Sequence, residues 1–301
     1  MNKNIDNLSF RLAEYAQRSI LYEAVLTPKP GLVDAVNTGA HNDMDIFTFI
    51  DSSSNLFKGF YLYAKAGLEC KGSEKELFSS IRKIGIDVEK EMFSATKNIN
   101  THKGINFSMG IVLAAAGYYL RDKDIDEHVI LSYSDTTEIL NTVRIMTEGL
   151  VKRDFENIRK KEKLTHGEKL YVEKGFSGIR GEAESGFPTV EKTSLPRLRE
   201  LSHRNMSMEQ KLLDVLFHLM SISDDSNIVN RGGLEALEFV KAISHEFLEI
   251  GIIYEDGFRE KIHEMNNLFV EKNISPGGAA DLLSITIFFG LLESVLTPLP
   301  S

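Results

Sequence analysis

The chain has 301 residues, of which 42% are hydrophobic and 26% charged, a composition typical of a globular protein with a large core. Its formal net charge is −9, so it lacks the broad excess of lysine and arginine that binding to nucleic acid or to an anionic membrane requires. Cys70 is the single cysteine, which excludes an internal disulfide and a cysteine-based zinc cluster.

The ends of the chain predict a protein without a membrane segment. The N-terminal residues MNKNIDNLSFRL lack the apolar stretch of a secretion signal. The most apolar segment, residues 282–296, is too short to cross a bilayer comfortably and includes Glu293. We therefore expect a cytoplasmic protein.

Apolar residues recur at helical spacing along most of the chain, and period-two alternation is rare. Pro28 ends the first helix, and Ser73 with Glu76 forms a capping-box pattern at the start of the third. Residues 104–120 are apolar nearly all round, as expected of a buried helix. The sequence predicts helices near residues 8–26, 46–69, 73–98, 104–120, 135–152, 195–203, 208–222, 233–248, 255–271 and 279–296.

This pattern predicts one all-α domain over residues 1–301, a single globular unit of about ten helices layered round residues 105–120 and 282–296. Residues 153–192 are the least regular, and we expect them to form a lid. The charged run at 153–163 is expected to be solvated surface.

Five polar turns, most of them rich in glycine, lie at the ends of predicted helices. Their glycines permit tight bends or close approach of the backbone to a ligand. Each turn also has a plain structural interpretation, such as Asp45 serving as a helix N-cap or Asp281 complementing a helix dipole. The turns span Thr27–Asp45, Asn100–Gly104, Gly175–Pro188, Asp224–Gly233 and Asn273–Leu283.

Taken together, the five turns hold a distinctive set of charges. Cations and helix N-termini bind phosphates, whereas carboxylate oxygens bind Mg²⁺. The sequence lacks the Walker and dinucleotide-binding glycine patterns and the spacing of a calcium-binding EF-hand. It therefore predicts a site for a Mg²⁺–nucleotide complex where helix ends converge. The cations are Lys29, Lys103, Arg180 and Arg231, and the carboxylates are Asp43, Asp45, Glu182, Asp225 and Asp281.

The same segments carry a family resemblance. TPKPGLVDAVNTGAHNDMD, NTHKG, GIRGEAESGFP, DSN…RGG and SPGGAADLL, in this order over residues 27–283, resemble the motifs of the triphosphoribosyl-dephospho-coenzyme A synthase family. The resemblance implies transfer of the triphosphoribosyl group of ATP to the ribose 2′-hydroxyl of 3′-dephospho-CoA, with release of adenine. The product would be the prosthetic-group precursor of citrate lyase or malonate decarboxylase, and a carrier-protein-loading transferase would be a further partner. A homodimer is left open.

The resemblance also implies roles for residues in the five turns. Asp43, Asp45 and Glu182 are the expected catalytic carboxylates, and Mg²⁺ would be held by Asp43, Asp45, Asp225 and Asp281. His41 could hydrogen-bond the leaving adenine or a metal-bound carboxylate. The expected substrate-binding residues are Lys29, His41, Lys103, Arg180, Arg231, Gly232, Gly277 and Gly278.

Two other functions use the same residues. A Mg²⁺-dependent all-α hydrolase could act on a nucleotide or an ADP-ribosyl group, with the carboxylates activating water. A non-catalytic protein could bind a nucleotide or a lyase subunit and present it.

Overall fold

The structure, a computed structural model, describes residues 2–123, 129–155, 164 and 166–296. Every regular element in these ranges is helical, and they contain no strand, which confirms the predicted all-α class. Within the same ranges, no helix is both long and apolar enough to cross a membrane. Most of the charged run at 153–163 lies outside the described residues.

Most helices follow one another closely along the chain, whereas residues 26–45 separate the first two. Those of the first half are α1 (Asn2–Val25), α2 (Ile46–Glu69), α3 (Glu74–Ala95), α4 (Lys103–Leu120), α5 (Tyr133–Thr147) and α6 (Leu150–Phe155). The second half contains α7 (His166–Lys174), α8 (Gly178–Glu184), the π-helical turn η2 (Val190–Ser194), α9 (Leu195–Ser202), α10 (Met208–Ile222), α11 (Ser226–Ile250), the 3₁₀ turn η3 (Ile252–Tyr254), α12 (Phe258–Glu271) and α13 (Gly277–Leu292).

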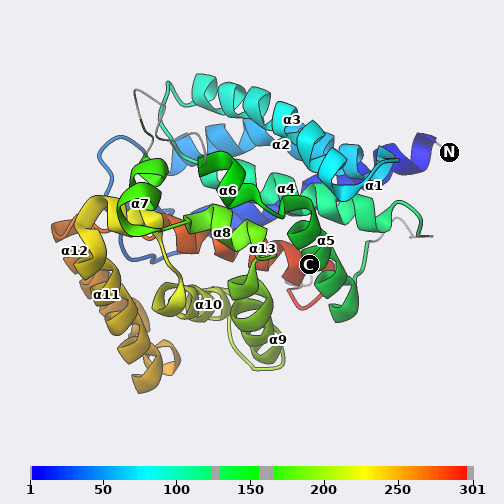
Figure 1. The fold of residues 1–301 in the computed structure, drawn as a ribbon. Coiled ribbons are helices and arrows are strands. Elements are labelled where there is room, and N and C mark those ends of the chain that lie inside the picture. The colour runs from blue at the N-terminus through cyan, green and yellow to red at the C-terminus, as the bar shows by residue number, and fades with distance from the viewer. Residues whose placement is uncertain (1, 124–128, 156–163, 165, 297–301) are drawn as a thin grey trace.

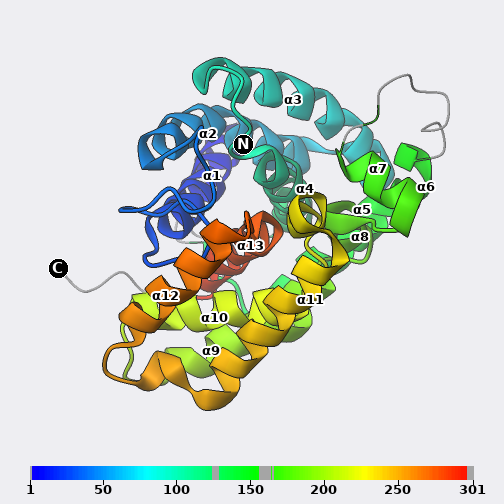
Figure 2. The ribbon, with the colours of Figure 1, turned by 90° about the vertical axis from the view of Figure 1, so that its left-hand side faces the viewer.

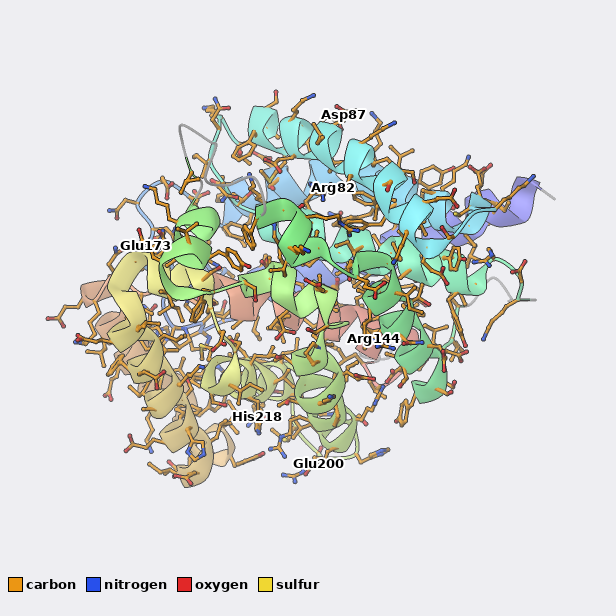
Figure 3. The ribbon with its side chains drawn as sticks, in the orientation of Figure 1. Arg82, Asp87, Arg144, Glu173, Glu200 and His218 are labelled. Atoms are coloured by element: carbon orange, nitrogen blue, oxygen red, sulfur yellow. The ribbon has the colours of Figure 1, made fainter. Side chains whose placement is uncertain are left out.

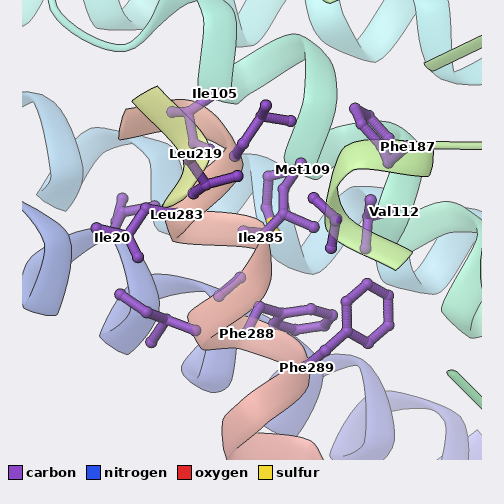
Figure 4. Close-up of a cluster of buried hydrophobic side chains, with 14 of the residues drawn as sticks. Ile20, Ile105, Met109, Val112, Phe187, Leu219, Leu283, Ile285, Phe288 and Phe289 are labelled. Carbon is purple, nitrogen blue, oxygen red and sulfur yellow. The ribbon is translucent and has the colours of Figure 1, made fainter. Parts of the chain in front are cut away.

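Two apolar helices, α4 and α13, lie in the middle of the molecule, as the two views in Figures 1 and 2 show. Helices α2 and α3 cover one side of them, and α9 and α10 lie on the other. In Figure 4, Leu283 and Phe288 of α13 lie among Ile20 of α1 and Met109 and Val112 of α4. One cluster of buried apolar side chains extends from α1 to α13. Helices α4 and α13 lie at its centre, as the sequence predicted.

Helices α2 and α4 cross at very short range because each has a glycine at the crossing. A Cβ atom added to Gly67 would lie 2.1 Å from the carbonyl oxygen of Ala114, and one added to Gly117 would lie 2.3 Å from that of Ala64. No side chain fits at either position, since real Cβ atoms do not approach a backbone oxygen so closely. This crossing fixes α4, whose N-terminus leads to the site described below.

Several helix starts are set by reciprocal side-chain caps. Ser73 and Glu76 form the predicted capping box at α3, and Ser132 with Asp135 and Ser207 with Gln210 form others at α5 and α10. Asp45 caps α2 in the same way with Thr48.

Two sequence predictions about helices were wrong, and one was confirmed. The helix expected at 135–152 is divided at Gly149, which takes a φ of 73°, so α5 and α6 are separate. The helix expected from 233 is present, because α11 consists of two helical segments that meet at the non-helical Gly233. The irregular segment at 175–188 contains a short helix, α8.

Some of the acidic residues lie on the outer surface. Asp87 of α3 and Glu200 of α9 are both exposed and project at opposite sides of the molecule in Figure 3. Charged groups at such positions interact weakly through solvent and contribute little to stability.

The crossing of α2 and α4 gives a test of the packing. We expect Gly117→Ala to lower the free energy of unfolding by about 1–3 kcal/mol, because the added methyl forces the two helices apart. Urea denaturation measures this change. Ser79→Ala, on the exposed face of α3, is the control and should change stability by less than about 0.5 kcal/mol. An equally stable Gly117→Ala protein would contradict the close crossing.

Candidate functional site

All five polar segments line one cavity of about 1560 Å³, although they are spread over some 250 residues of sequence. This volume exceeds the range of about 300–1,000 Å³ that is usual for a single small ligand. Charged residues contributed by each segment include Asp43, Lys103, Arg180, Asp225 and Asp281. The cavity therefore gathers at least one charged residue from every predicted turn and has room for more than one small molecule.

Asp225 joins the N-termini of two helices at the cavity. As the N-cap of α11, it accepts a hydrogen bond from the backbone N–H of Asn227 at 2.8 Å. Its other oxygen accepts hydrogen bonds from the N–H groups of Gly278 and Ala279, at 2.7 and 3.1 Å, in the first turn of α13. Burial raises the pKa of the carboxyl, and these N–H groups oppose the rise. Asp225, predicted as a metal ligand, is thus engaged with backbone in the structure.

Glycines at the helix ends let polar side chains approach the backbone. A Cβ atom on Gly278 would lie 2.9 Å from the Asp225 carboxylate, and one on Gly277 would lie 3.0 Å from the Asn227 amide. At the start of α4, a Cβ atom on Gly104 would lie 2.0 Å from an oxygen of Asp281. The glycines of the second and fifth segments are therefore required by the packing of the site itself.

Asp281 is the carboxylate with the strongest electrostatic penalty in the cavity. Burial, together with the neighbouring carboxylates of Asp225 and Glu23, raises its pKa well above the ordinary value. Hydrogen bonds from the described residues make no contribution to this shift. A cation bound next to Asp281 would relieve the repulsion, since it would stabilise the ionised carboxylate.

His41 and Arg231 form a second polar group at the cavity. The Nε2 atom of His41 lies 2.8 Å from the Ser275 hydroxyl, and its Nδ1 atom lies 3.1 Å from the Arg231 guanidinium. Burial and the Arg231 charge lower the pKa of His41, so the ring is neutral near pH 7. Arg231 also donates to the carbonyl oxygen of Ala40, which fixes its position, and Asp43 lies 3.8 Å from the ring.

Arg180 and Lys103 are two further cations that line the cavity. Arg180 donates to Asp154 at 3.0 Å and lies over the rings of Phe107 and Phe155. Lys103, the first residue of α4, lies 2.8 Å from Glu89. Both pairs are partly exposed, so incoming phosphate oxygens could compete with the carboxylates for these charges.

Glu182 lies in α8 and lines the cavity. The Thr189 hydroxyl donates to it at 2.6 Å, which fixes the orientation of the carboxyl group. Burial raises its pKa above the ordinary value. A carboxylate with a raised pKa is a better proton acceptor than an exposed one.

Lys29, Asp45 and Gly232 were predicted in the site, but the structure does not place them among the residues that line the cavity. The side chain of Lys29 is 1% exposed, and its ammonium group forms an ion pair with Glu23. Asp45 is the exposed N-cap of α2, and Gly232 lies inside α11. These placements favour structural roles, as the sequence already allowed for Asp45.

Glu23 is a residue of the cavity that the sequence analysis missed. It lies in the last turn of α1, lines the cavity and is 4% exposed. Its position in the sequence could have indicated burial, because it continues the apolar helix face formed by Leu12, Ala16 and Ile20. A carboxylate on such a face needs a partner, which here is Lys29.

Within the described ranges, no three histidine, cysteine or acidic side chains are grouped closely enough to hold a metal ion. The predicted set of four aspartates therefore does not form a preorganised metal cage there. Mg²⁺ commonly uses only one or two carboxylates and takes its remaining ligands from substrate phosphates and water. Asp281 and Asp43 suit that mode, since both line the cavity.

Comparison with known proteins identifies the family. The family model described as ATP:dephospho-CoA triphosphoribosyl transferase matches residues 9–297. The chain belongs to this family. Membership confirms the predicted resemblance and makes the chain a transferase of the triphosphoribosyl-dephospho-CoA synthase type.

Two relatives of similar sequence agree with the family assignment. Proteins from Streptococcus mutans and Streptococcus equi subsp. equi, each named "probable 2-(5''-triphosphoribosyl)-3'-dephosphocoenzyme-A synthase", are 40% and 39% identical to the chain, over 95% of it and 97% of each relative. A crystal structure from Archaeoglobus fulgidus, assigned as a triphosphoribosyl-dephospho-CoA synthase, is 17% identical with a TM-score of 0.47, over 81% of this chain and 98% of that one.

The double cap formed by Asp225 can be tested by mutation. We expect Asp225→Ala to lower the free energy of unfolding by about 2–4 kcal/mol, because it removes the side-chain cap of α11 and leaves N–H groups of α13 without their acceptor. Urea denaturation measures the loss. Asp224→Ala, at the exposed neighbour, is the matched control and should cost less than about 1 kcal/mol. Equal effects of the two substitutions would rule out a special role for Asp225.

Proposed function

We propose that the chain transfers the triphosphoribosyl group of ATP to the ribose 2′-hydroxyl of 3′-dephospho-CoA and releases adenine. The observation that carries this proposal is one large cavity among the described residues, in which cations from three polar segments lie with the carboxylates of Glu23, Asp225 and Asp281. Two nucleotides bring several phosphates, which need cations, and the transfer between them needs a proton acceptor. The family assignment supports the same reaction.

The proposed reaction breaks the bond between the anomeric carbon of ATP and N9 of adenine. A new bond forms between that carbon and the 2′-oxygen of the acceptor. The hydroxyl loses its proton and adenine gains one, so the overall reaction neither consumes nor releases protons. The positive charge that develops on the ribosyl carbon is stabilised by nearby carboxylates, as in glycoside hydrolysis.

Glu182 is the group we assign to accept the hydroxyl proton. Its carboxyl lines the cavity, Thr189 holds its orientation, and burial favours its protonated form more than for an exposed glutamate. A proton acceptor must both bind the proton in the transition state and be ionised beforehand. Asp43 and Asp45 are less suited, because Asp43 is largely exposed and Asp45 is the N-cap of α2.

We assign the phosphates to the cations and helix ends of the cavity. Lys103 lies at the N-terminus of α4, and Arg231 lies on α11 within hydrogen-bonding distance of His41. Gly277 and Gly278 bring the first turn of α13 to the cavity wall. The start of α4 contributes N–H groups and a favourable dipole for an anion, whereas the first N–H groups of α13 are taken by Asp225. Arg180, which also lines the cavity, adds a further positive charge.

Mg²⁺, if bound with ATP, would neutralise phosphate charge and polarise the triphosphate. We propose Asp281 as its main protein ligand, with Asp43 as a second. Asp281 fits because its carboxylate is repelled by Asp225 and Glu23 and no described hydrogen bond offsets that repulsion. The product would serve citrate lyase or malonate decarboxylase, after a second transferase loads it onto a carrier protein.

Adenine release tests the proposed reaction directly. Incubation of the protein with ATP, Mg²⁺ and 3′-dephospho-CoA should release adenine only when all three are present. Mass spectrometry should find a product equal in mass to the sum of the two nucleotides less adenine. Adenine or phosphate formed without 3′-dephospho-CoA would instead indicate a hydrolase.

Replacement of Glu182 tests the proton acceptor. We expect Glu182→Gln to lower kcat by about 10²–10⁴-fold, because the amide keeps the shape of the side chain but cannot accept the proton. Steady-state assays of adenine release measure the change. Glu173→Gln, on the exposed face of α7, is the control and should retain the rate. A Glu182→Gln protein with an unchanged kcat would exclude this assignment.

The pH dependence gives a second readout of Glu182. Its ionised form accepts the proton, so kcat/KM should rise with pH as the carboxyl ionises. Since burial raises its pKa, this rise should lie above the ordinary glutamate value of 4.5. The rise should be absent from the residual activity of Glu182→Gln. A profile that falls with pH over the same range would contradict the role.

A further inference from the structure

His102 is a residue of the cavity with no role in the account so far. It is the N-cap of α4 but makes no side-chain cap hydrogen bond. Its side chain lines the cavity and is 4% exposed. The ring packs edge-on against Phe49, with the ring centres 4.8 Å apart. A buried polar ring at a helix start requires partners for both of its nitrogens.

A chain of hydroxyl groups satisfies one of these nitrogens. The Thr101 hydroxyl donates to the Ser52 hydroxyl at 2.7 Å, and the Ser52 oxygen lies 2.7 Å from Nδ1 of His102. Among the described residues the Ser52 hydroxyl forms no other hydrogen bond, so Nδ1 is the acceptor available to its proton. Nδ1 is then the acceptor of the ring, and the proton of the neutral ring is on Nε2.

The Nε2–H group has no hydrogen-bond partner among the described residues, although it is buried. The ring cannot avoid this by binding a second proton, since burial and the nearby ammonium of Lys29 lower the pKa of His102 to about 3. The free protein therefore keeps a neutral, fixed and unused donor. Because Nε2 itself is buried, a ligand that shifts the ring or its neighbours slightly and brings an acceptor to this position would satisfy it.

The surroundings indicate which acceptor. Lys103 follows His102 directly, and the first turn of α4 presents its N-terminal end to the same cavity. The positive end of the helix dipole favours an anion there. The carboxylate of Asp281, which we assign to Mg²⁺, lies against Gly104 in that turn. An oxygen of a metal-bound phosphate is the acceptor that fits all three features.

We propose that the Nε2–H group of His102 donates a hydrogen bond to a phosphate oxygen of a bound nucleotide at the N-terminus of α4. The inference rests on the proposed function, because the triphosphate of ATP and the diphosphate of 3′-dephospho-CoA are the two possible sources of that oxygen. His102 would then be a substrate-binding residue, and Ser52 and Thr101 would be the residues that fix its tautomer.

Calorimetric titrations with MgATP and with 3′-dephospho-CoA separate the two sources. We expect His102→Leu to weaken the binding of one nucleotide by about tenfold or more and to leave the other within about threefold. His102→Gln can place an amide N–H near the position of Nε2 and should retain most of the affinity. The nucleotide that loses affinity identifies the phosphate chain.

Nitrogen-15 NMR of the wild-type protein gives a readout that does not depend on a variant folding. The spectrum should show a neutral ring protonated on Nε2, and the Nε2–H signal should shift when that nucleotide binds. A proton on Nδ1, or unchanged affinities for both nucleotides in His102→Leu, would overturn the inference. Adenine transfer by the wild-type protein would still support the proposed function in that case, whereas a wild-type protein that binds neither nucleotide would overturn both.

Discussion

A buried carboxylate that caps two helices at once is the constraint on which the site depends. Asp225 accepts hydrogen bonds from the first turn of α11 and from the first turn of α13, two helices that begin about fifty residues apart. Each helix start would otherwise bury N–H groups without acceptors, at a cost of about 1–3 kcal/mol for each. One side chain meets both needs, and it can do so only because Gly278 lacks a side chain that would collide with it. The positions of α11 and α13 relative to each other are thereby fixed at the wall of the cavity.

The distribution of charge in the cavity follows from this arrangement. With Asp225 seated between two helix starts, the next carboxylate, Asp281, lies near it without a compensating hydrogen bond from the described residues, and its pKa rises accordingly. The partly exposed cations Lys103 and Arg180 and the half-buried Arg231 surround this negative centre. In the free protein the charges of these carboxylates and cations are only partly neutralised. They become neutralised when phosphates and a divalent cation bind together. The same reasoning applies to the unpartnered donor of His102, which is satisfied only by a ligand.

The sequence predicted the helices well where periodicity and caps agreed, as at α3, where Ser73 and Glu76 mark the start. It failed at Gly149, which ends a helix that was predicted to continue. At Gly233 it correctly placed the start of a helical segment, but it missed the segment that begins at Ser226. Within the site, the sequence found all five segments of the cavity but could not separate residues that face it from those that support it. Lys29 resembles a phosphate-binding cation until its partner is known, and that partner, Glu23, reaches it only through the tertiary packing of α1.

The central claim is that the start of α4, with Lys103, binds the phosphates of a nucleotide. A crystal structure of the protein with Mg²⁺ and an ATP analogue that cannot lose its base tests this most directly. We predict phosphate oxygens within hydrogen-bonding distance of Lys103 and of the first turn of α4, with the metal ion next to Asp281. A triphosphate bound at another face of the molecule, with the start of α4 in contact only with water, would contradict the account.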